Sequence, residues 1–217
     1  MKKFLTFILI SLCLIMSSCT DSATTGTGRG VYLLLDTSGT YTAELKKAQQ
    51  IINYLLGTLG PGDSLVVARI DSASFSEKDI VAKVTFDARP SVSNNQKKIF
   101  AKTVDKFVKS VRGSKYTDIS GGLLQAIEYL NEVNAAEKHI LIYSDLKEEL
   151  PKGFVRDMDF ILDGFTVRAL NVTKLRSDNV NPQEYLDRLE EWQARVTHGG
   201  GKWIVINDMQ RADALAL

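Results

Sequence analysis

Short apolar runs alternate with longer amphipathic stretches along most of the chain. Residues 31–35 (VYLLL) form the first run, and an uninterrupted run of this kind is typical of a strand buried on both faces of a parallel sheet. The same pattern predicts further strands at residues 64–71, 80–86, 139–143, 166–172 and 203–206. Residues 72–78 are too few for a crossover helix, so the strands on either side of them are predicted to pair antiparallel.

Between these strands, apolar residues recur at the spacing of one helical face. Helices are predicted at residues 41–59, at residues 96–111, after residue 118 and from Asn181, where Asn-Pro-Gln-Glu is a typical helix start. Their inward faces are predicted to carry Leu45, Ala48, Ile51, Ile52, Leu55 and Leu56; Ile99, Phe100, Val104, Phe107, Val108 and Val111; Leu123, Ile127 and Leu130; and Tyr185, Leu186, Leu189, Trp192 and Val196. The alternation predicts an α/β fold with a doubly wound, mostly parallel sheet, one antiparallel edge strand and helices on both faces.

The amino-terminal segment has the features of an export signal. Lys2 and Lys3 precede an apolar stretch, residues 4–16, which is too short to span a bilayer. The sequence Met16-Ser17-Ser18-Cys19 that follows resembles the lipobox of bacterial lipoproteins. That resemblance implies a signal peptide over residues 1–18, cleavage before Cys19, lipidation of Cys19 and anchoring in a membrane. The alternative is an ordinary signal peptide followed by an incidental cysteine.

The cysteine content fits the lipoprotein interpretation. Cys13 is lost with the signal, so Cys19 is expected to be the only cysteine of the mature chain, which excludes an intrachain disulfide. Residues 19–30 are small, polar and glycine-rich, which predicts a flexible tether. Thr20 is not the aspartate that commonly retains lipoproteins at the inner membrane. We therefore expect a location in the bacterial cell envelope, with the outer membrane favoured where there are two membranes.

Residues 31–217 are predicted to form one domain with a sizeable core. The chain carries 27 basic and 26 acidic side chains, and loss of Lys2 and Lys3 leaves 25 against 26. This near neutrality gives no support for nucleic-acid binding.

Three polar loops carry the candidate chemistry. Asp36, Ser38 and Thr40 follow the first strand at alternate positions, Thr117 lies before the third helix, and Asp145 follows the strand at 139–143. Carboxylate and hydroxyl oxygens at the carboxyl ends of strands suit a hard cation such as Mg²⁺. The competing interpretation of each loop is a turn or a helix cap, and capping is the role expected of Asp118.

Taken together, the three loops resemble the metal-ion-dependent adhesion site of the von Willebrand factor type A domain. That family carries Asp-x-Ser-x-Ser, then a threonine, then an aspartate in this order. The resemblance implies that Ser38 and Thr40 bind the cation directly, that Thr117 does so when a partner is engaged, and that Asp36 and Asp145 act mostly through water. It implies Mg²⁺, with Mn²⁺ or Ca²⁺ as alternatives, and a coordination position left for a carboxylate of a partner protein. Thr40 departs from the serine usual in the family.

The loop before Thr117 carries Arg112, Lys115 and Tyr116, which are expected on the same rim as the cation. A basic and aromatic rim suits an acidic partner segment. The alternative is a solvated loop whose charges serve solubility only.

These observations predict a membrane-anchored, cation-dependent protein-binding module for adhesion or complex assembly, and not an enzyme. One alternative is a phosphatase of the haloacid dehalogenase type, but its second aspartate, two residues after the nucleophile, is replaced here by Ser38. Another is a metal-free scaffold of the envelope. His139 and His198 have no metal-ligand partner at useful spacing in the sequence.

Overall fold

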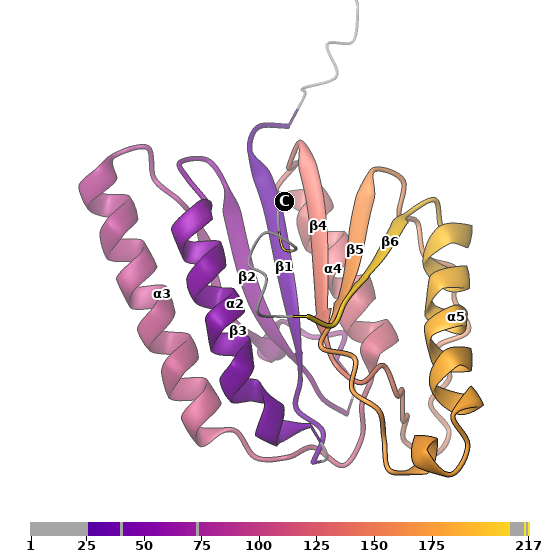
Figure 1. Ribbon diagram of the computed structural model, residues 1–217. Helices are drawn as coiled ribbons and strands as arrows, with labels where there is room; N and C mark the ends of the chain where they lie inside the picture. Colours follow the sequence, from indigo (N-terminus) through magenta and orange to yellow (C-terminus); the bar gives the residue numbers. More distant parts are fainter. Residues whose placement is uncertain (1–25, 40, 73, 209–214, 216) are drawn as a thin grey trace, which may run out of the picture.

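A single six-stranded sheet forms the centre of the protein (Figure 1). The structure is a computed structural model and describes residues 26–39, 41–72, 74–208, 215 and 217. Its strand order is β3-β2-β1-β4-β5-β6, and only the edge strand β3 runs antiparallel to its neighbour. The strands are β1 (Arg29–Asp36), β2 (Ser64–Ile70), β3 (Ile80–Thr85), β4 (Glu137–Tyr143), β5 (Phe165–Leu170) and β6 (Lys202–Ile206). The predicted fold class is confirmed.

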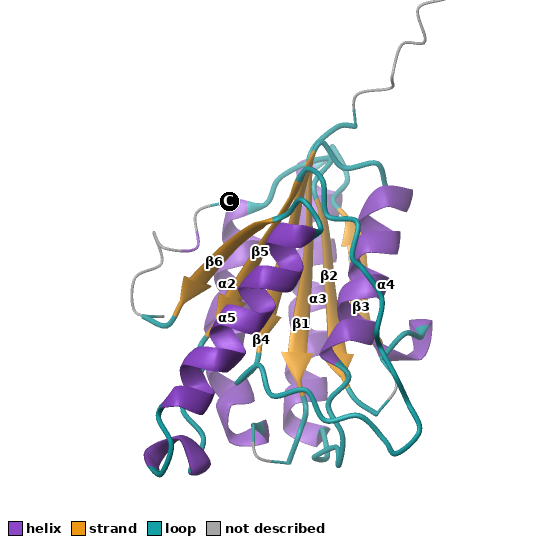
Figure 2. Ribbon diagram, turned by 90° about the vertical axis from the view of Figure 1, so that its right-hand side faces the viewer, coloured by secondary structure: helices purple, strands orange, loops and turns teal. Residues whose placement is uncertain are grey.

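Helices cover both faces of the sheet, as the side view shows (Figure 2). Helices α2 (Leu45–Thr58) and α3 (Pro90–Ser110) pack on one face, and α4 (Ile119–Glu132) and α5 (Gln183–His198) pack on the other. Short 3-10 turns are found at η1 (Thr42–Glu44), η2 (Glu77–Asp79) and η3 (Ser177–Asn179). The protein is therefore a three-layer α/β structure.

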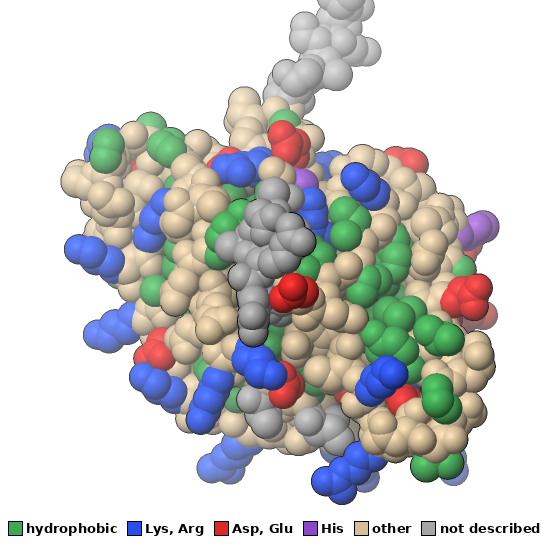
Figure 3. Space-filling view, in the orientation of Figure 1, with side chains coloured by type: hydrophobic (Ala, Val, Ile, Leu, Met, Phe, Trp, Pro, Cys, Tyr) green, Lys and Arg blue, Asp and Glu red, His purple; other side chains and the backbone are tan. Residues whose placement is uncertain are grey.

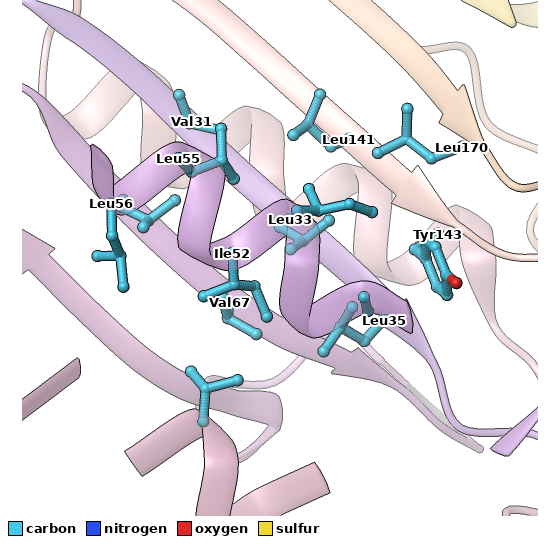
Figure 4. Close-up of a cluster of buried hydrophobic side chains, with 14 of the residues drawn as sticks. Val31, Leu33, Leu35, Ile52, Leu55, Leu56, Val67, Leu141, Tyr143 and Leu170 are labelled. Carbon is cyan, nitrogen blue, oxygen red and sulfur yellow. The ribbon is translucent and has the colours of Figure 1, made fainter. Parts of the chain in front are cut away.

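Strand β1 contributes to both cores because successive side chains of a strand point to opposite faces. Val31, Leu33 and Leu35 pack under α2, whereas Tyr32 and Leu34 pack under α4. The helix side of the first core is formed by Ile52, Leu55 and Leu56, shown in Figure 4. All five of these β1 side chains are fully buried, in agreement with the wholly apolar run in the sequence.

Several predicted boundaries and faces are wrong. Helix α3 begins at Pro90 instead of Gln96, because proline fits the first position of a helix, where no amide hydrogen bond is lost. Ile99 was predicted to face inward but is 58% exposed, and Leu186 is 52% exposed. The predicted helix start at Asn181 is also wrong: helix α5 begins at Gln183, and Pro182 in the cap position makes no side-chain cap hydrogen bond.

The topology places the candidate loops at one edge. Since β1, β4 and β5 are parallel, the segments that follow Asp36, Tyr143 and Leu170 all leave the carboxyl edge of the sheet, at the bottom of Figure 1. Residues 26–28 enter β1 at the opposite edge. The eight residues of β1 separate these two edges by about 26 Å. No helix in the described part of the chain has the length and apolar character needed to cross a membrane.

Candidate metal centre

Asp36 closes strand β1 and lies fully buried. Its Oδ1 accepts a hydrogen bond from the Ser38 backbone N–H at 2.7 Å, and its Oδ2 accepts one from the Ser144 hydroxyl at 2.5 Å. The first contact shapes the turn after β1, and the second ties it to the end of β4. Burial raises the pKa of Asp36, and the hydrogen bonds from Ser144 and Ser38 oppose that rise.

The loop of residues 112–118 lies directly against the turn after β1. The Gly39 N–H donates to the Ser114 carbonyl at 3.0 Å, and the Ser114 N–H donates to the Thr37 carbonyl at 2.7 Å. Gly113 makes this approach possible, because a Cβ atom at that position would lie 2.8 Å from the Gly39 Cα. Two loops far apart in sequence are thus joined through their backbones.

Thr117 lies in the same loop and is only 3% exposed. Its backbone exchanges two hydrogen bonds with Glu149, of 2.8 and 3.0 Å, in the segment that follows β4. Within the described residues, the Thr117 hydroxyl has no hydrogen-bond partner. The loop is therefore held between the turn after β1 and the segment after β4, with one hydroxyl left uncommitted.

Asp118 has a structural role, as predicted. Its Oδ1 accepts from the Gly121 N–H at 2.8 Å, which caps α4. Arg156 Nη2 donates to its Oδ2 at 2.8 Å, and the Ser74 N–H donates to the same atom at 3.0 Å. A fully buried carboxylate with this many donors is satisfied by the protein itself.

Asp145 follows β4 and is 3% exposed. Its Oδ1 accepts from the Lys147 N–H at 2.9 Å, whereas its Oδ2 has no hydrogen-bond partner among the described residues. Burial and, to a smaller extent, the nearby charge of Asp36 raise the pKa of Asp145 to about 6, against the opposing effects of the Lys147 N–H and of Arg188. The two carboxylates thus interact unfavourably when both are ionised.

The chain after Asp145 is held in an unusual conformation. Leu146 has a φ angle of 64°, in the left-handed region that a branched side chain rarely adopts. Its N–H donates to the Ser144 hydroxyl at 3.0 Å, and its carbonyl accepts from Trp192 Nε1 at 3.0 Å. These contacts hold Asp145 at the edge of the sheet.

These residues fit a hard divalent cation. Asp36, Ser38, Thr117 and Asp145 come from loops that meet at the carboxyl edge, while Thr40 lies outside the described residues. No lysine or arginine in the described part of the chain forms a salt bridge with Asp36 or Asp145. No group of three or more histidine, cysteine or acidic side chains suited to a metal is present there either. The donors are instead two carboxylates and hydroxyls, which suit Mg²⁺ better than Zn²⁺.

Comparison with protein families and with curated proteins finds no match. Among solved structures, the von Willebrand factor type A protein from Catenulispora acidiphila is 15% identical over 87% of this chain and 41% of its own, with a TM-score of 0.50. The pilus adhesin SpaC from Lactobacillus rhamnosus GG is 13% identical over 87% of this chain and 28% of its own, with a TM-score of 0.52. The PilB minor pilin from Streptococcus sanguinis is 14% identical over 90% of this chain and 60% of its own, with a TM-score of 0.50.

The chain has a von Willebrand factor type A fold. It spans less than two thirds of the length of each of these three proteins. At such low identity the likeness concerns the fold.

Sequence reasoning missed Ser144, the side chain that joins two loops of this type A fold. Its hydroxyl donates to Asp36 and accepts from the Leu146 N–H, so it links the ends of β1 and β4. The available signal was its position, since Ser144 lies at the carboxyl end of a buried strand immediately before a predicted ligand. Ser114 was missed because its partners lie far from it in the sequence: its backbone bonds Thr37 and Gly39, and its hydroxyl donates to Asp71 Oδ1 at 2.5 Å.

The predicted partner rim adjoins the turn after β1 in this type A fold. Arg112 and Lys115 are exposed and Tyr116 is half-buried. The Lys115 ammonium lies 5.3 Å from the centroid of the Tyr116 ring, within reach of a cation–π contact. Ser114, between Arg112 and Lys115, is the residue bonded to Thr37 and Gly39, so the rim is held beside the candidate site.

Proposed function

We propose that this protein binds a divalent cation, Mg²⁺ in the first place, and uses it to bind a partner protein. Asp36, Ser38, Thr40, Thr117 and Asp145 would hold the ion. The observation that carries the proposal is the pair of buried carboxylates, Asp36 and Asp145, at the carboxyl ends of the neighbouring strands β1 and β4, neither of which forms a salt bridge among the described residues. A bound divalent cation neutralises both charges.

When bound, the ion would offer a coordination position to an anionic ligand. Two carboxylates balance the charge of one divalent cation, and Mg²⁺ favours oxygen ligands in octahedral geometry. A carboxylate from a partner protein is the ligand that this charge favours. Arg112, Lys115 and Tyr116 would contact the surrounding acidic segment of the partner.

The position of the chain's amino-terminal end supports a role at a membrane surface. Residues 26–28 enter β1 at the edge of the sheet opposite the candidate site. If Cys19 is lipidated, the membrane therefore lies on the side away from the cation. The site then faces the aqueous part of the cell envelope, where a partner protein can reach it. Cys19 itself lies outside the described residues.

Cation titration tests the proposal. Calorimetry with the purified mature chain is expected to show one Mg²⁺ site in the wild type and none in Asp36→Ala or Asp36→Asn, with circular dichroism retained. Asp157→Ala, in which an exposed acid is removed, is the matched control and is expected to bind like the wild type. Unchanged Mg²⁺ affinity in both Asp36 variants would refute the site.

The same preparation separates the alternatives. A wild type that binds no Mg²⁺ points to a metal-free scaffold, and Mg²⁺-dependent hydrolysis of p-nitrophenyl phosphate that is lost in Asp36→Asn points to a phosphatase.

Lipidation is tested in cells. We expect Cys19→Ala to release the protein from membranes or to leave the precursor uncleaved, because the mature chain has no other cysteine to accept the lipid. Fractionation and gel mobility identical to those of the wild type would exclude the lipoprotein assignment.

A further inference from the structure

A basic pocket adjoins the candidate cation site at Asp145. It has a volume of about 510 Å³ and is lined by Asp145 and by the segment that follows β5. Three basic side chains line it, Lys147, Lys174 and Arg176, together with the hydroxyl residues Thr173 and Ser177. We refer to it below as the basic pocket.

The charges of the basic pocket are available to a ligand. Lys174 and Arg176 are exposed, and neither forms a salt bridge with an acidic side chain of the described residues. Lys147 contacts Glu149 at 2.6 Å, but both side chains are about half exposed, and a surface pair of this kind exchanges readily with a competing anion. In the space-filling view, lysine and arginine side chains lie along this lower edge of the molecule (Figure 3).

The wall of the basic pocket is held in place by a buried ion pair. Arg188 on α5 donates to both carboxylate oxygens of Asp178, at 2.7 and 3.0 Å, and the Asp178 side chain is fully buried. Asp178 Oδ2 also accepts from the Leu175 N–H at 2.7 Å, which fixes the turn between Lys174 and Arg176. A pocket that is already formed loses little conformational entropy when it binds a ligand.

We propose that the basic pocket binds a second carboxylate of the partner. This inference rests on the proposed function, in which a first carboxylate binds the cation. A partner segment that binds at both the candidate cation site and the basic pocket must carry at least two acidic side chains, one for each. Asp145 lines the pocket and belongs to the candidate site, so the two places adjoin. Three basic side chains against one acidic side chain favour an anionic ligand.

Labelled peptides test the inference. The probes are fluorescein-labelled hexaglutamate and a hexapeptide of five serines and one glutamate, with binding to the mature chain measured by fluorescence anisotropy at low salt, in Mg²⁺ and in EDTA. In Mg²⁺ we expect the wild type to bind hexaglutamate about tenfold more tightly than the single-glutamate peptide. Lys174→Glu/Arg176→Glu is expected to lose that preference while it binds Mg²⁺ and the single-glutamate peptide as the wild type does.

Lys98→Glu/Lys102→Glu on α3 is the matched control, because both lysines are exposed and the change in net charge is the same. It is expected to keep the preference, and the unfolding temperature of each variant checks its fold. A pocket variant with the same preference as this control overturns the inference, as does a wild type that shows no preference in either buffer.

The two proposals fail in different ways. Absence of Mg²⁺ binding in calorimetry overturns the proposed function. In that case, the basic pocket is still supported as an anion-binding site if the wild type and the Lys98→Glu/Lys102→Glu control bind hexaglutamate in EDTA and Lys174→Glu/Arg176→Glu does not.

Discussion

Replacement of Asp145 by asparagine isolates the energetic cost of the buried charge at the candidate site. Asparagine has nearly the same shape and keeps an oxygen that can accept the Lys147 N–H, which Asp145 Oδ1 accepts at 2.9 Å. It has no charge, so the repulsion with Asp36 and the cost of burying an ionised carboxylate both disappear. Without a cation, Asp145→Asn is therefore expected to be more stable than the wild type at neutral pH.

The magnitude follows from the pKa of Asp145, which is raised from its ordinary value of 3.8 to about 6. Each tenfold change in a protonation equilibrium corresponds to about 1.4 kcal/mol, so the shift gives about 3 kcal/mol at pH 7.5. Because the pKa is raised in the folded state, the stabilising effect of the protonated group is complete below pH 3.8 and is lost as the pH rises through about 6. The gain of Asp145→Asn should therefore be small at pH 4 and reach its plateau above pH 7.

Urea unfolding followed by tryptophan fluorescence measures this difference. Trp192 is buried and contacts Leu146, so its emission reports on this region. In EDTA at pH 7.5, the variant's unfolding midpoint should lie roughly 1 M urea above that of the wild type. With Mg²⁺ at 100 times its dissociation constant, the wild type gains about 2.7 kcal/mol and the difference nearly closes, because the variant no longer holds the ion.

Asp157→Asn, at an exposed acid, is the control and should show neither effect. An Asp145→Asn variant no more stable than the wild type in EDTA at pH 7.5 would refute the reasoning. A gain of equal size at pH 4 would also refute it, because Asp145 is already protonated there in the folded state.

Two further predictions concern contacts that shape the site. Gly113→Ala places a Cβ atom 2.8 Å from the Gly39 Cα, so we expect the Mg²⁺ affinity measured by calorimetry to fall several-fold while the fold is retained. Gly57→Ala is the control, because the new methyl group meets open space, and it should bind Mg²⁺ like the wild type. Asp118→Ala removes a helix cap and leaves Arg156 without its buried partner, which should lower the free energy of unfolding by about 3–5 kcal/mol in urea denaturation. Glu77→Ala, at an exposed pair, should leave the midpoint unchanged, and equal effects of the two substitutions would contradict this account.

The architecture could be predicted from the residues alone, because the patterns involved are local. An uninterrupted apolar run such as residues 31–35 can bury all of its side chains only in a strand that has helices packed on both faces of the sheet. The helical spacing of apolar residues from Leu45 to Leu56 predicts an amphipathic helix that packs through one face. The short connection at residues 72–78 was enough to predict that β3 pairs antiparallel. Polar residues directly after strands 31–35 and 139–143 pointed to one edge of the sheet, because parallel strands end together.

Some local expectations failed where two local rules compete. The polar residues before Gln96 favoured a loop, but Pro90 is well suited to start a helix, and α3 extends back to it. Ile99 and Leu186 match the helical spacing and are nevertheless exposed. The spacing identifies the apolar face of a helix but does not say how much of that face the sheet and the adjacent helices cover.

The contacts between the loops could not be predicted and depend on how the chain packs. The hydrogen bond between Ser144 and Asp36 joins residues 108 positions apart, and the contact of Gly113 with Gly39 depends on two backbones at van der Waals distance. The basic pocket likewise requires Lys147, Asp145 and the Lys174–Arg176 turn to line one cavity, with Asp178 bonded to both Arg188 and the Leu175 N–H of the turn. No periodicity in the chain encodes these contacts, because each depends on the distance between segments that only the packed sheet brings together.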